Sequence, residues 1–426
     1  MSEPSTVVFR CPQCAAEHEL DGRWAPWCDE CEWGATPDDK RERGTWFDRW
    51  WRRRLDAASA REHERLLTKG INSGPGHDRS AVLLFATLVH AVTAGVIVVL
   101  LCIWLTPALL VFQIVITGVA VGLAFLMWPR SLKDEPQGLV MDRERAPELW
   151  MLVDEIASAL GAQAPGRIEL RAFVNASWGQ VGRRRQRVLS LGYPLWAALE
   201  GQEKVALLGH EIGHEVNGDL TRGRYVGAAL HELREWRTLM LGGNDVMRVG
   251  FNARRGAVTV RQAGLGLLML PITSVLLFLQ IRLDQLSARS HQFAEHKADD
   301  LGARLAGTDG ALSLERAMLD PAVLGFAVTS GLRADNRADI WDLASGHRHE
   351  VPEHERRRQL VMARKTLTSV DSTHPPTYRR LELLSQPPAH APNVLLTPDR
   401  ESRIDAEVRC HEDWVRRRFF GKREDV

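Results

Sequence analysis

The sequence predicts a mainly helical α+β protein that is built from unlike parts. Four cysteines lie within the first 31 residues, and the 50 residues from Ser80 to Pro129 include no Asp, Glu, Lys or Arg. A charged region with helical patterning follows. Paired cysteines favour a small module held together by a metal, and a charge-free stretch of this length favours membrane helices.

Composition limits the classes of protein to consider. The chain has 426 residues, 45% of them hydrophobic, and a formal net charge of +1. This length predicts two or three domains, and the ordinary apolar content excludes a disordered chain. Six cysteines are too few for a disulfide scaffold. Because the net charge is near zero, we do not expect nucleic acid as a partner.

The N-terminal cysteines form two CxxC knuckles. Cys11 and Cys14 are separated by 13 residues from Cys28 and Cys31. Four thiolates at this spacing can close a tetrahedral site, so the sequence predicts a zinc ribbon with one structural zinc. Free or redox-active thiols are the alternative, which a reducing cytoplasmic location disfavours. The ribbon also leaves room for a protein partner.

Residues 45–67 are patterned as a helix. Three tryptophans and a leucine recur at helical spacing beside four arginines (Trp46, Trp50, Trp51, Leu55, Arg49, Arg52, Arg53 and Arg54). Tryptophan with arginine just before a membrane segment is typical of an amphipathic helix at the lipid interface. An ordinary packing helix explains the pattern equally well.

The charge-free stretch predicts a transmembrane hairpin. One helix of this length would measure about 75 Å, against a hydrocarbon core of roughly 30 Å. We therefore expect two spans, Ala81–Leu105 and Ala108–Trp128, with the turn at Thr106-Pro107. The alternative is a pair of buried helices in a soluble core.

Cations flank this hairpin on both sides, whereas its turn carries none. They are Arg52, Arg53, Arg54, Lys69 and Arg79 before it, and Arg130, Lys133, Arg143 and Arg145 after it. The positive-inside rule places both flanks in the cytoplasm. The sequence thus predicts a multi-pass integral membrane protein of the cell membrane, in contact with the lipid bilayer.

The segment HEIGH at His210–His214 carries the chemistry. The preceding residues, Gln202–Gly209, are helical in character, so the two imidazoles share one helix face and can reach one metal. Glu211 lies beside them as a general base that can polarise a water on zinc. A pentapeptide of this kind also occurs by chance, and further residues must support the interpretation.

A catalytic zinc needs a third protein ligand, for which Glu295 is the strongest candidate. Asp299 follows four residues later on the same helical face. It can accept a hydrogen bond from a ligand histidine and so fix its tautomer. His291 and His296 are alternative ligands of lower rank, and a solvated acidic helix face would also suit this segment.

Several separated motifs resemble the membrane-associated zinc metallopeptidases of the HtpX and CAAX prenyl protease family. Asn175-Ala176 is similar to the segment before a β-hairpin in that family, and HEIGHEVNGD at His210–Asp219 resembles its extended HExxH motif. Glu295–Asp299 is similar to its ExxAD helix, and Ser372–Arg380 to its STHPP segment. The resemblance covers roughly Arg145–Leu384, and the motifs occur in the same order as in the family.

The resemblance implies a zincin-like metallopeptidase domain with a small β-sheet, and a role for each matched residue. His210, His214 and Glu295 would bind the catalytic zinc, with Asp299 behind them. Glu211 would act as the general base and then protonate the leaving amine.

Two further matched segments would contact the substrate. His374 and Arg380 would stabilise the oxyanion, since a cation or N–H donor opposite the metal is what that charge requires. Asn175 and Ala176 would lie on an edge strand that pairs with an extended peptide. The alternatives are a helix-capping loop at His374 and a simple strand end at Asn175.

The topology departs from the family. Bacterial relatives resembling HtpX usually cross the membrane twice between the HExxH motif and the third ligand, but only Gln262–Ile281 is a strong candidate here. Both motifs must share one side of the membrane. We expect 262–281 to be membrane-embedded or re-entrant, with Pro271 at the bend. A second option is that Tyr225–Leu241 is a shielded helix beside the membrane.

The predicted organisation has five parts. They are a zinc ribbon (1–36), a linker with the interfacial helix (37–79), the transmembrane hairpin (80–129), the zinc metallopeptidase domain (130–388) and a helical tail (389–426). Thr397-Pro398 begins the tail helix, which docks on the domain or on the membrane.

The sequence predicts a membrane-anchored zinc metalloendopeptidase with two zinc ions, one catalytic and one structural. Its ribbon and active site would be cytoplasmic, and its substrates would be peptides in membrane-associated or misfolded proteins. Two alternatives stay open: a CAAX-type processing protease for lipidated peptides, and a catalytically silent zinc-binding membrane scaffold. The intact Glu211 argues against the scaffold.

Overall fold

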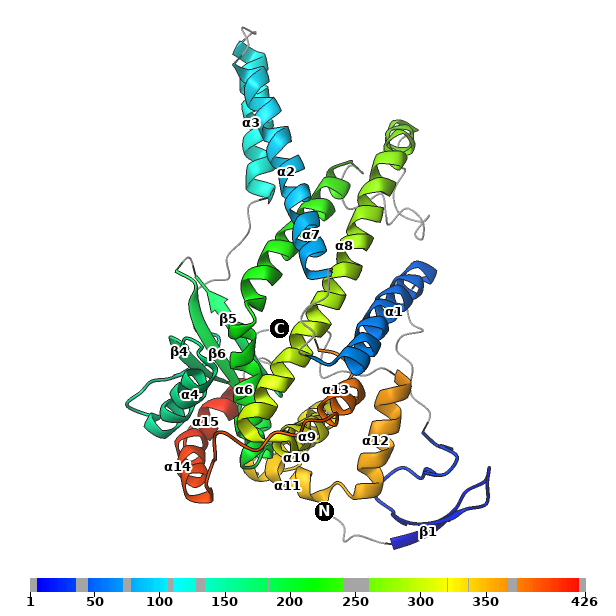
Figure 1. Ribbon diagram of the computed structural model, residues 1–426, viewed down its shortest axis with the longest axis vertical. Helices are drawn as coiled ribbons and strands as arrows, with labels where there is room; N and C mark the ends of the chain where they lie inside the picture. Colours follow the sequence, from blue (N-terminus) through cyan, green and yellow to red (C-terminus); the bar gives the residue numbers. More distant parts are fainter. Residues whose placement is uncertain are drawn as a thin grey trace.

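The computed structural model describes residues 6–35, 45–71, 78–105, 110–127, 135–182, 184–240, 260–319, 321–335, 337–366 and 374–420. Two long pairs of helices rise from a mixed domain, and a small cysteine module lies at the opposite end (Figure 1).

The cysteine module is a two-stranded antiparallel hairpin. Strand β1 is Thr6–Arg10 and β2 is Glu17–Asp21, with one knuckle after each strand. The module docks on helix α12, Glu353–Thr366. Two ion pairs join them, Arg357–Asp29 at 3.2 Å and Lys365–Glu32 at 2.8 Å.

Helix α1 is Trp46–Lys69, which confirms the helix expected at 45–67. Ala58 and Leu66 are buried, and Nε2 of His63 lies 3.0 Å from a carboxylate oxygen of Glu382. The second half of α1 therefore packs on the domain. A membrane-interface role for its tryptophan-rich first half stays a prediction.

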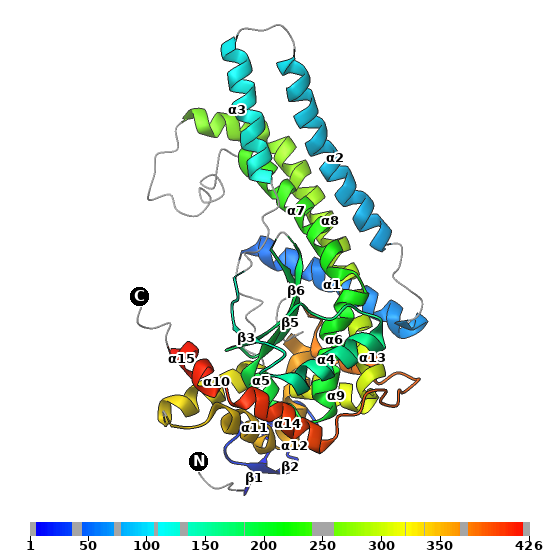
Figure 2. The same cartoon turned by 90° about the vertical axis from the view of Figure 1, so that its left-hand side faces the viewer.

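Two antiparallel helices occupy the charge-free stretch. Helix α2 is Asp78–Trp104 and α3 is Leu110–Met127, close to the two expected spans. They lie side by side and project away from the rest of the chain (Figure 2). The expected turn at Thr106-Pro107 lies outside the described residues.

A second pair of helices packs against α2. Helix α7 is Asp219–Met240 and α8 is the 47-residue helix Val260–Ala306. Pro271 lies inside α8, which runs as one helix from Val260 to Ala306, so the chain does not reverse at the expected bend. Helix α8 packs against α7. Whether 262–281 is embedded in a membrane stays a prediction.

These helices expose large apolar side chains, as lipid-facing helices do. By length and composition, Arg79–Trp104 and Met269–Ala306 are apolar enough to cross a membrane. Exposed residues are present on α2, α3 and α8 (Leu84, Leu88, Val92, Val111, Phe112, Ile114, Leu270, Val275 and Phe278).

One charged residue of α7, Glu232, has hydrogen-bond partners on α2. Oε1 of Glu232 lies 2.6 Å from Nδ1 of His90, and Thr93 donates to Oε2 over 2.7 Å. Trp236 donates to the Thr93 hydroxyl. The buried Glu232 is thus hydrogen-bonded, which lowers the cost of removing it from water.

The main domain, residues 135–384, holds a four-stranded sheet in the order β3-β4-β6-β5. The strands are Leu139–Met141 (β3), Arg167–Arg171 (β4), Ala176–Val181 (β5) and Gln186–Gly192 (β6). Strands β4 and β6 are parallel, and the other pairings are antiparallel. The sheet places β5 at one edge.

Helices surround this sheet and share one apolar core with it. They are α4 (Pro147–Leu160), α5 (Tyr193–Ala198), α6 (Gln202–Val216), α9 (Thr308–Ala317), α10 (Pro321–Ala334), α11 (Ile340–Glu350) and α13 (Thr377–Leu384). The expectation of a mainly helical domain with a small sheet is confirmed.

The C-terminal tail docks on the domain. Its two helices are α14, Pro398–Arg409, and α15, Glu412–Phe420, and Thr397 caps α14 as expected. Nζ of the buried Lys204 on α6 lies 2.8 Å from Glu401 and 2.7 Å from Asp405. The tail therefore fixes the first turns of the HExxH helix.

Candidate active site

Small residues let helices α6 and α8 approach closely. A β-carbon added to Gly209 would lie 3.0 Å from the Cα of Gly302, and one added to Gly302 would lie 2.9 Å from the carbonyl oxygen of Ala206. One turn further, a β-carbon on Gly213 would lie 3.3 Å from the Cα of Ala298. This contact places the two histidines of α6 opposite the carboxylates of α8.

Three predicted ligands meet at this helix crossing. The Nε2 atoms of His210 and His214 are 3.2 Å apart. Each lies 3.6 Å from an oxygen of Glu295. In a tetrahedral site whose ligand atoms each lie about 2.0–2.2 Å from zinc, the ligand atoms are separated from one another by distances close to those between these three atoms. The donor set therefore fits zinc without rearrangement. His291 and His296 are not in this cluster.

Asp299 orients the first of these histidines. Its Oδ1 lies 2.8 Å from Nδ1 of His210, so a proton on Nδ1 leaves the Nε2 lone pair facing the other ligands. Burial lowers the pKa of His210, which favours the neutral imidazole that a metal requires. The predicted supporting role of Asp299 agrees with this geometry.

The third ligand is held as a carboxylate. Burial opposes its ionisation, but the neighbouring His214 and His374 hold the pKa of Glu295 below its usual range. Only about 3% of this residue is exposed. A buried carboxylate facing three imidazoles supplies the negative charge that a zinc site of this type uses.

Arg380 lies behind His210, and its role in catalysis stays a prediction. Its guanidinium is buried and donates to Asp299, with Nε 2.9 Å from Oδ2. It also pairs with Glu315 at 2.8 Å and lies 3.3 Å from Nδ1 of His210. The guanidinium is thus on the Nδ1 side of the imidazole, opposite the Nε2 atom that faces the other predicted ligands. This placement favours support of His210 over the predicted contact with an oxyanion.

His374, in contrast, lies on the ligand side of the cluster. Its Nδ1 is 2.5 Å from Oε2 of Glu295, and its ring centroid is 5.6 Å from that of His210. Ser372 and Thr373, which precede it in the STHPP segment, lie outside the described residues. The position of His374 is compatible with contact to a reacting group.

Glu211 is buried on α6, one residue after His210. The fold therefore keeps the expected general base beside the ligand cluster and away from bulk solvent.

Asn175 and Ala176 lead into the edge strand β5, as expected. The Asn175 side chain accepts a hydrogen bond from the Ala176 N–H, and its carbonyl accepts one from Gly192 on β6. Strand β5 is joined to α6 because Trp178 donates to Glu215 over 3.1 Å. The edge of the sheet thus lies beside the HExxH helix.

Glu315, a buried residue on α9 that contacts Arg380, was not predicted from the sequence. Burial raises its pKa to about 8. No local motif marks it, because it meets the site only through the packing of α9 on α13. Its polar character inside an apolar helix face was the one available signal.

The four cysteines also form a compact group. Sγ of Cys11 is 3.5 Å from that of Cys31, and Sγ of Cys14 is 3.5 Å from that of Cys28. All four sulfurs lie within 4.8 Å of one another, which fits a tetrahedral zinc. His18, also missed from the sequence, lies 3.2 Å from the Cys28 sulfur.

Comparison with known proteins agrees with this geometry. The chain is 26% identical over 257 residues to a protein named Protease HtpX homolog from Thermococcus kodakarensis, covering 58% of this chain and 75% of that protein. It is 26% identical over 219 residues to Protease HtpX of Pseudomonas savastanoi pv. phaseolicola, covering 48% and 70%. No solved structure matches the chain.

Residues 144–387 match the sequence profile of peptidase family M48. This range contains the HExxH helix, the third ligand, His374 and Arg380. Members of the family are zinc-dependent peptidases, and the HtpX relatives are membrane proteins. The chain belongs to peptidase family M48 and is a membrane protease.

Proposed function

We propose that this protein is a membrane-anchored zinc metalloendopeptidase that cleaves membrane-associated or misfolded proteins. The observation that carries the proposal is the cluster of His210, His214 and Glu295, in which Asp299 orients the first histidine. The donor set leaves room for a fourth position, as catalytic zinc sites require.

The residues of the chain divide the work of peptide hydrolysis. His210, His214 and Glu295 would hold zinc, which supplies Lewis-acid activation of water. Glu211 takes the proton from the attacking water and delivers it to the leaving amine. Arg380 and Asp299 keep the His210 ring in place, while His374 is positioned to donate to the developing oxyanion.

The edge strand β5 would hold the substrate. Its outer edge has no strand partner among the described residues, and Trp178 joins it to the HExxH helix. An extended peptide added antiparallel or parallel to this edge would pass beside the metal. Backbone pairing of this kind accepts many sequences, which suits an enzyme that degrades unfolded segments.

The active site and the ribbon would both be cytoplasmic. Cations precede α2 and follow α3, and the main domain and ribbon lie at the end of the molecule opposite the hairpin tip (Figures 1 and 2). Cysteines introduced at Ser290 and Ser345, after Cys102 and Cys410 are changed to Ser, test this. Labelling by a membrane-impermeant maleimide in intact cells would contradict the orientation.

Glu211→Gln tests the enzyme itself. The variant should keep its zinc and lose hydrolysis of an unfolded protein such as casein. It should also trap natural substrates for identification by mass spectrometry. If zinc-loaded wild type hydrolyses no tested protein faster than this variant, the proposed activity is wrong.

Processing of lipidated peptides is the second candidate. A cavity of about 340 Å³ between α2, α7 and α8 favours it, because its walls are almost entirely apolar (Phe85, Leu88, Val92, Leu233, Ile272 and Leu276). Such a cavity can accept a lipid chain of a substrate. Faster cleavage of a prenylated peptide than of its unmodified form would favour this candidate, and equal rates would favour degradation of misfolded proteins.

The ribbon would serve a structural purpose within the same chain. It packs on α12 through the contact of Trp27 with His354, whose ring centroids are 4.7 Å apart. A second, structural zinc would hold this small module in shape. A free face of the ribbon stays available for a protein partner.

A further inference from the structure

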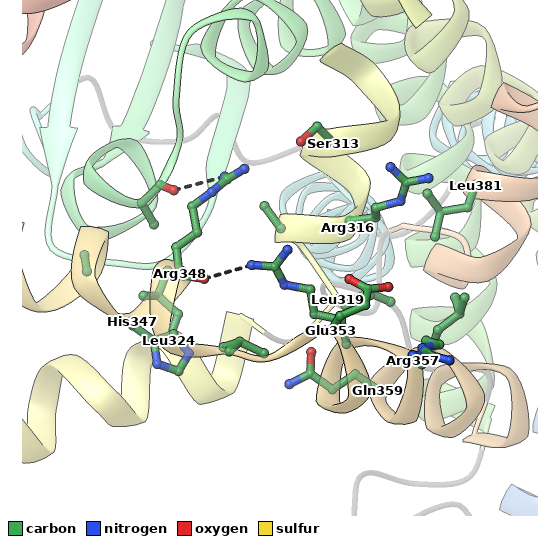
Figure 3. A pocket seen from close by; sticks show the side chains of 16 residues that line it. Ser313, Arg316, Leu319, Leu324, His347, Arg348, Glu353, Arg357, Gln359 and Leu381 are labelled. Carbon is green, nitrogen blue, oxygen red and sulfur yellow. Dashed lines mark hydrogen bonds between the residues drawn. The ribbon is translucent and has the colours of Figure 1, made fainter. Parts of the chain in front are cut away.

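A cationic cavity lies among helices α9–α13, apart from the metal cluster. Its volume is about 460 Å³, and its lining includes Arg316, Arg348, Arg356 and Arg357 but one acidic residue, Glu353. Figure 3 shows Arg316 and Leu381 on one side of it and His347 and Arg348 on the other. None of these residues belongs to the proposed catalytic site.

Two of the four arginines are already neutralised. Arg348 forms an ion pair with the buried Glu203, and Arg357 pairs with Asp29 of the ribbon at 3.2 Å. These contacts fix the walls of the cavity. They also leave little positive charge on either residue for another ligand.

The other two arginines have no such partner. Within the part of the chain that the structure describes, neither Arg316 nor Arg356 forms an ion pair. Arg356 only donates to the carbonyl oxygen of Arg348, over 3.0 Å. Glu353 is not paired with either of them, so the two guanidiniums give the cavity a net positive charge. Arginine presents donors in a planar fork that suits phosphate oxygens.

The rest of the cavity is apolar. Leu319, Leu324, Leu360 and Leu381 line it, and the first two are buried. Its volume lies in the range of roughly 300–1,000 Å³ that is usual for small-molecule sites. A ligand that fits both features carries an anionic group with several oxygens on an apolar body.

The position of the cavity excludes one source of such a ligand. Helices α10, α11 and α12 lie at the end of the molecule far from α2 and α3 (Figures 1 and 2). Headgroups of the bilayer that holds the hairpin do not reach it. A water-soluble compound is the occupant that agrees with this placement.

We propose that this cavity is a binding site for a soluble phosphate monoester with an apolar or planar group. Arg316 and Arg356 hold the phosphate, and the leucines contact the apolar part. The site adjoins the metal-orienting network, because Arg316 follows Glu315 on α9 and Leu381 follows Arg380 on α13. The proposal concerns binding and does not depend on proteolysis.

Isothermal titration calorimetry of the full chain in detergent tests the site, with phenyl phosphate and inorganic phosphate as probes. We expect saturable binding that is tighter for phenyl phosphate. Arg316→Gln and Arg356→Gln should each weaken it by about tenfold or more, the usual effect of losing a charge-assisted hydrogen bond. Arg333→Gln, an exposed arginine on α10 that does not line the cavity, is the matched control.

Several results would overturn the proposal. They are no saturable binding to wild type, unchanged affinity in both cavity variants, or an equal loss in Arg333→Gln, which would indicate surface electrostatics only. Equal affinities for phenyl phosphate and inorganic phosphate would show that the leucines do not bind the apolar part of the ligand. Arginine-dependent binding to phosphatidylglycerol vesicles without binding of either soluble probe would assign the site to a lipid.

Discussion

Arg380 and Asp299 form a buried ion pair directly behind the metal-binding face of His210. Nε of Arg380 donates to Oδ2 of Asp299 over 2.9 Å, and the other oxygen of that carboxylate lies 2.8 Å from Nδ1 of His210. The arginine would therefore act on a bound metal through two intervening side chains, Asp299 and His210. Such an indirect role differs from that of a residue that touches the substrate.

Arg380→Gln should loosen the metal site and destabilise the fold. The change leaves the Asp299 carboxylate buried without its cation, which typically costs about 3–5 kcal/mol. Zinc affinity should fall by roughly 10–100-fold, the usual effect of losing support behind a ligand. Chelator competition and urea unfolding measure the two effects.

Arg304→Gln is the control for Arg380, because that arginine is exposed and pairs with Asp300 on the surface of α8. It should change stability by no more than about 1 kcal/mol. A fall in kcat for Arg380→Gln at unchanged zinc affinity would return Arg380 to a direct catalytic role.

His374→Gln should impair the chemical step and leave the zinc in place. His374 contacts Glu295 but is not part of the three-ligand cluster. Loss of one oxyanion donor lowers kcat by about 10²–10³. Steady-state kinetics with zinc analysis of the same sample checks this. Loss of the catalytic zinc in the variant would instead make His374 a ligand or a support of Glu295.

Gly302→Ala should separate the two ligand helices. The new methyl group would meet the carbonyl oxygen of Ala206 at 2.9 Å, so α8 must shift away from α6. Overpacking of this kind costs about 1–3 kcal/mol, and zinc affinity should fall with it. Gly346→Ala on α11 is the matched control, since nothing lies within 4 Å of its added β-carbon. Equal stability of the two variants would show that α6 and α8 are not in tight contact.

His63 makes the packing of α1 sensitive to acid. Burial lowers its pKa, although its partner Glu382 opposes the shift and the neighbouring His296 and Arg379 add to it. The unfolded chain therefore binds the proton more readily than the folded chain, and stability falls as pH drops below about 6.5. The stability of His63→Gln minus that of wild type should therefore be larger at pH 5 than at pH 7.5. Parallel Tm curves for the two proteins between these pH values would exclude this effect.

Short motifs predicted the candidate metal ligands that the structure brings together, because the spacing within each motif is local in sequence. His210 and His214 share a helix face at a spacing of four, and Asp299 follows Glu295 at the same spacing. The charge-free stretch likewise predicted α2 and α3 to within three residues at each described end. In the two motifs the period of the helix decides which residues share a face, and in the hairpin the length without charge decides the spans.

Contacts between distant segments were not predictable in this way. The role of Arg380 depended on which side of His210 its guanidinium occupies, and Glu315 reaches it from another helix. The contact of Glu232 on α7 with His90 on α2 likewise joins residues 142 positions apart. The docking of the ribbon on α12 similarly rests on side chains more than 300 residues apart.

The central claim is that His210, His214 and Glu295 hold a zinc ion. Zinc K-edge absorption spectroscopy of the Cys11→Ser/Cys14→Ser variant tests it most directly, because that variant should keep only the catalytic metal. We predict one zinc per chain in place of two, with nitrogen and oxygen ligands near 2.0–2.2 Å and the multiple scattering of two imidazoles. A variant without zinc, or zinc bound by sulfur, would contradict the account.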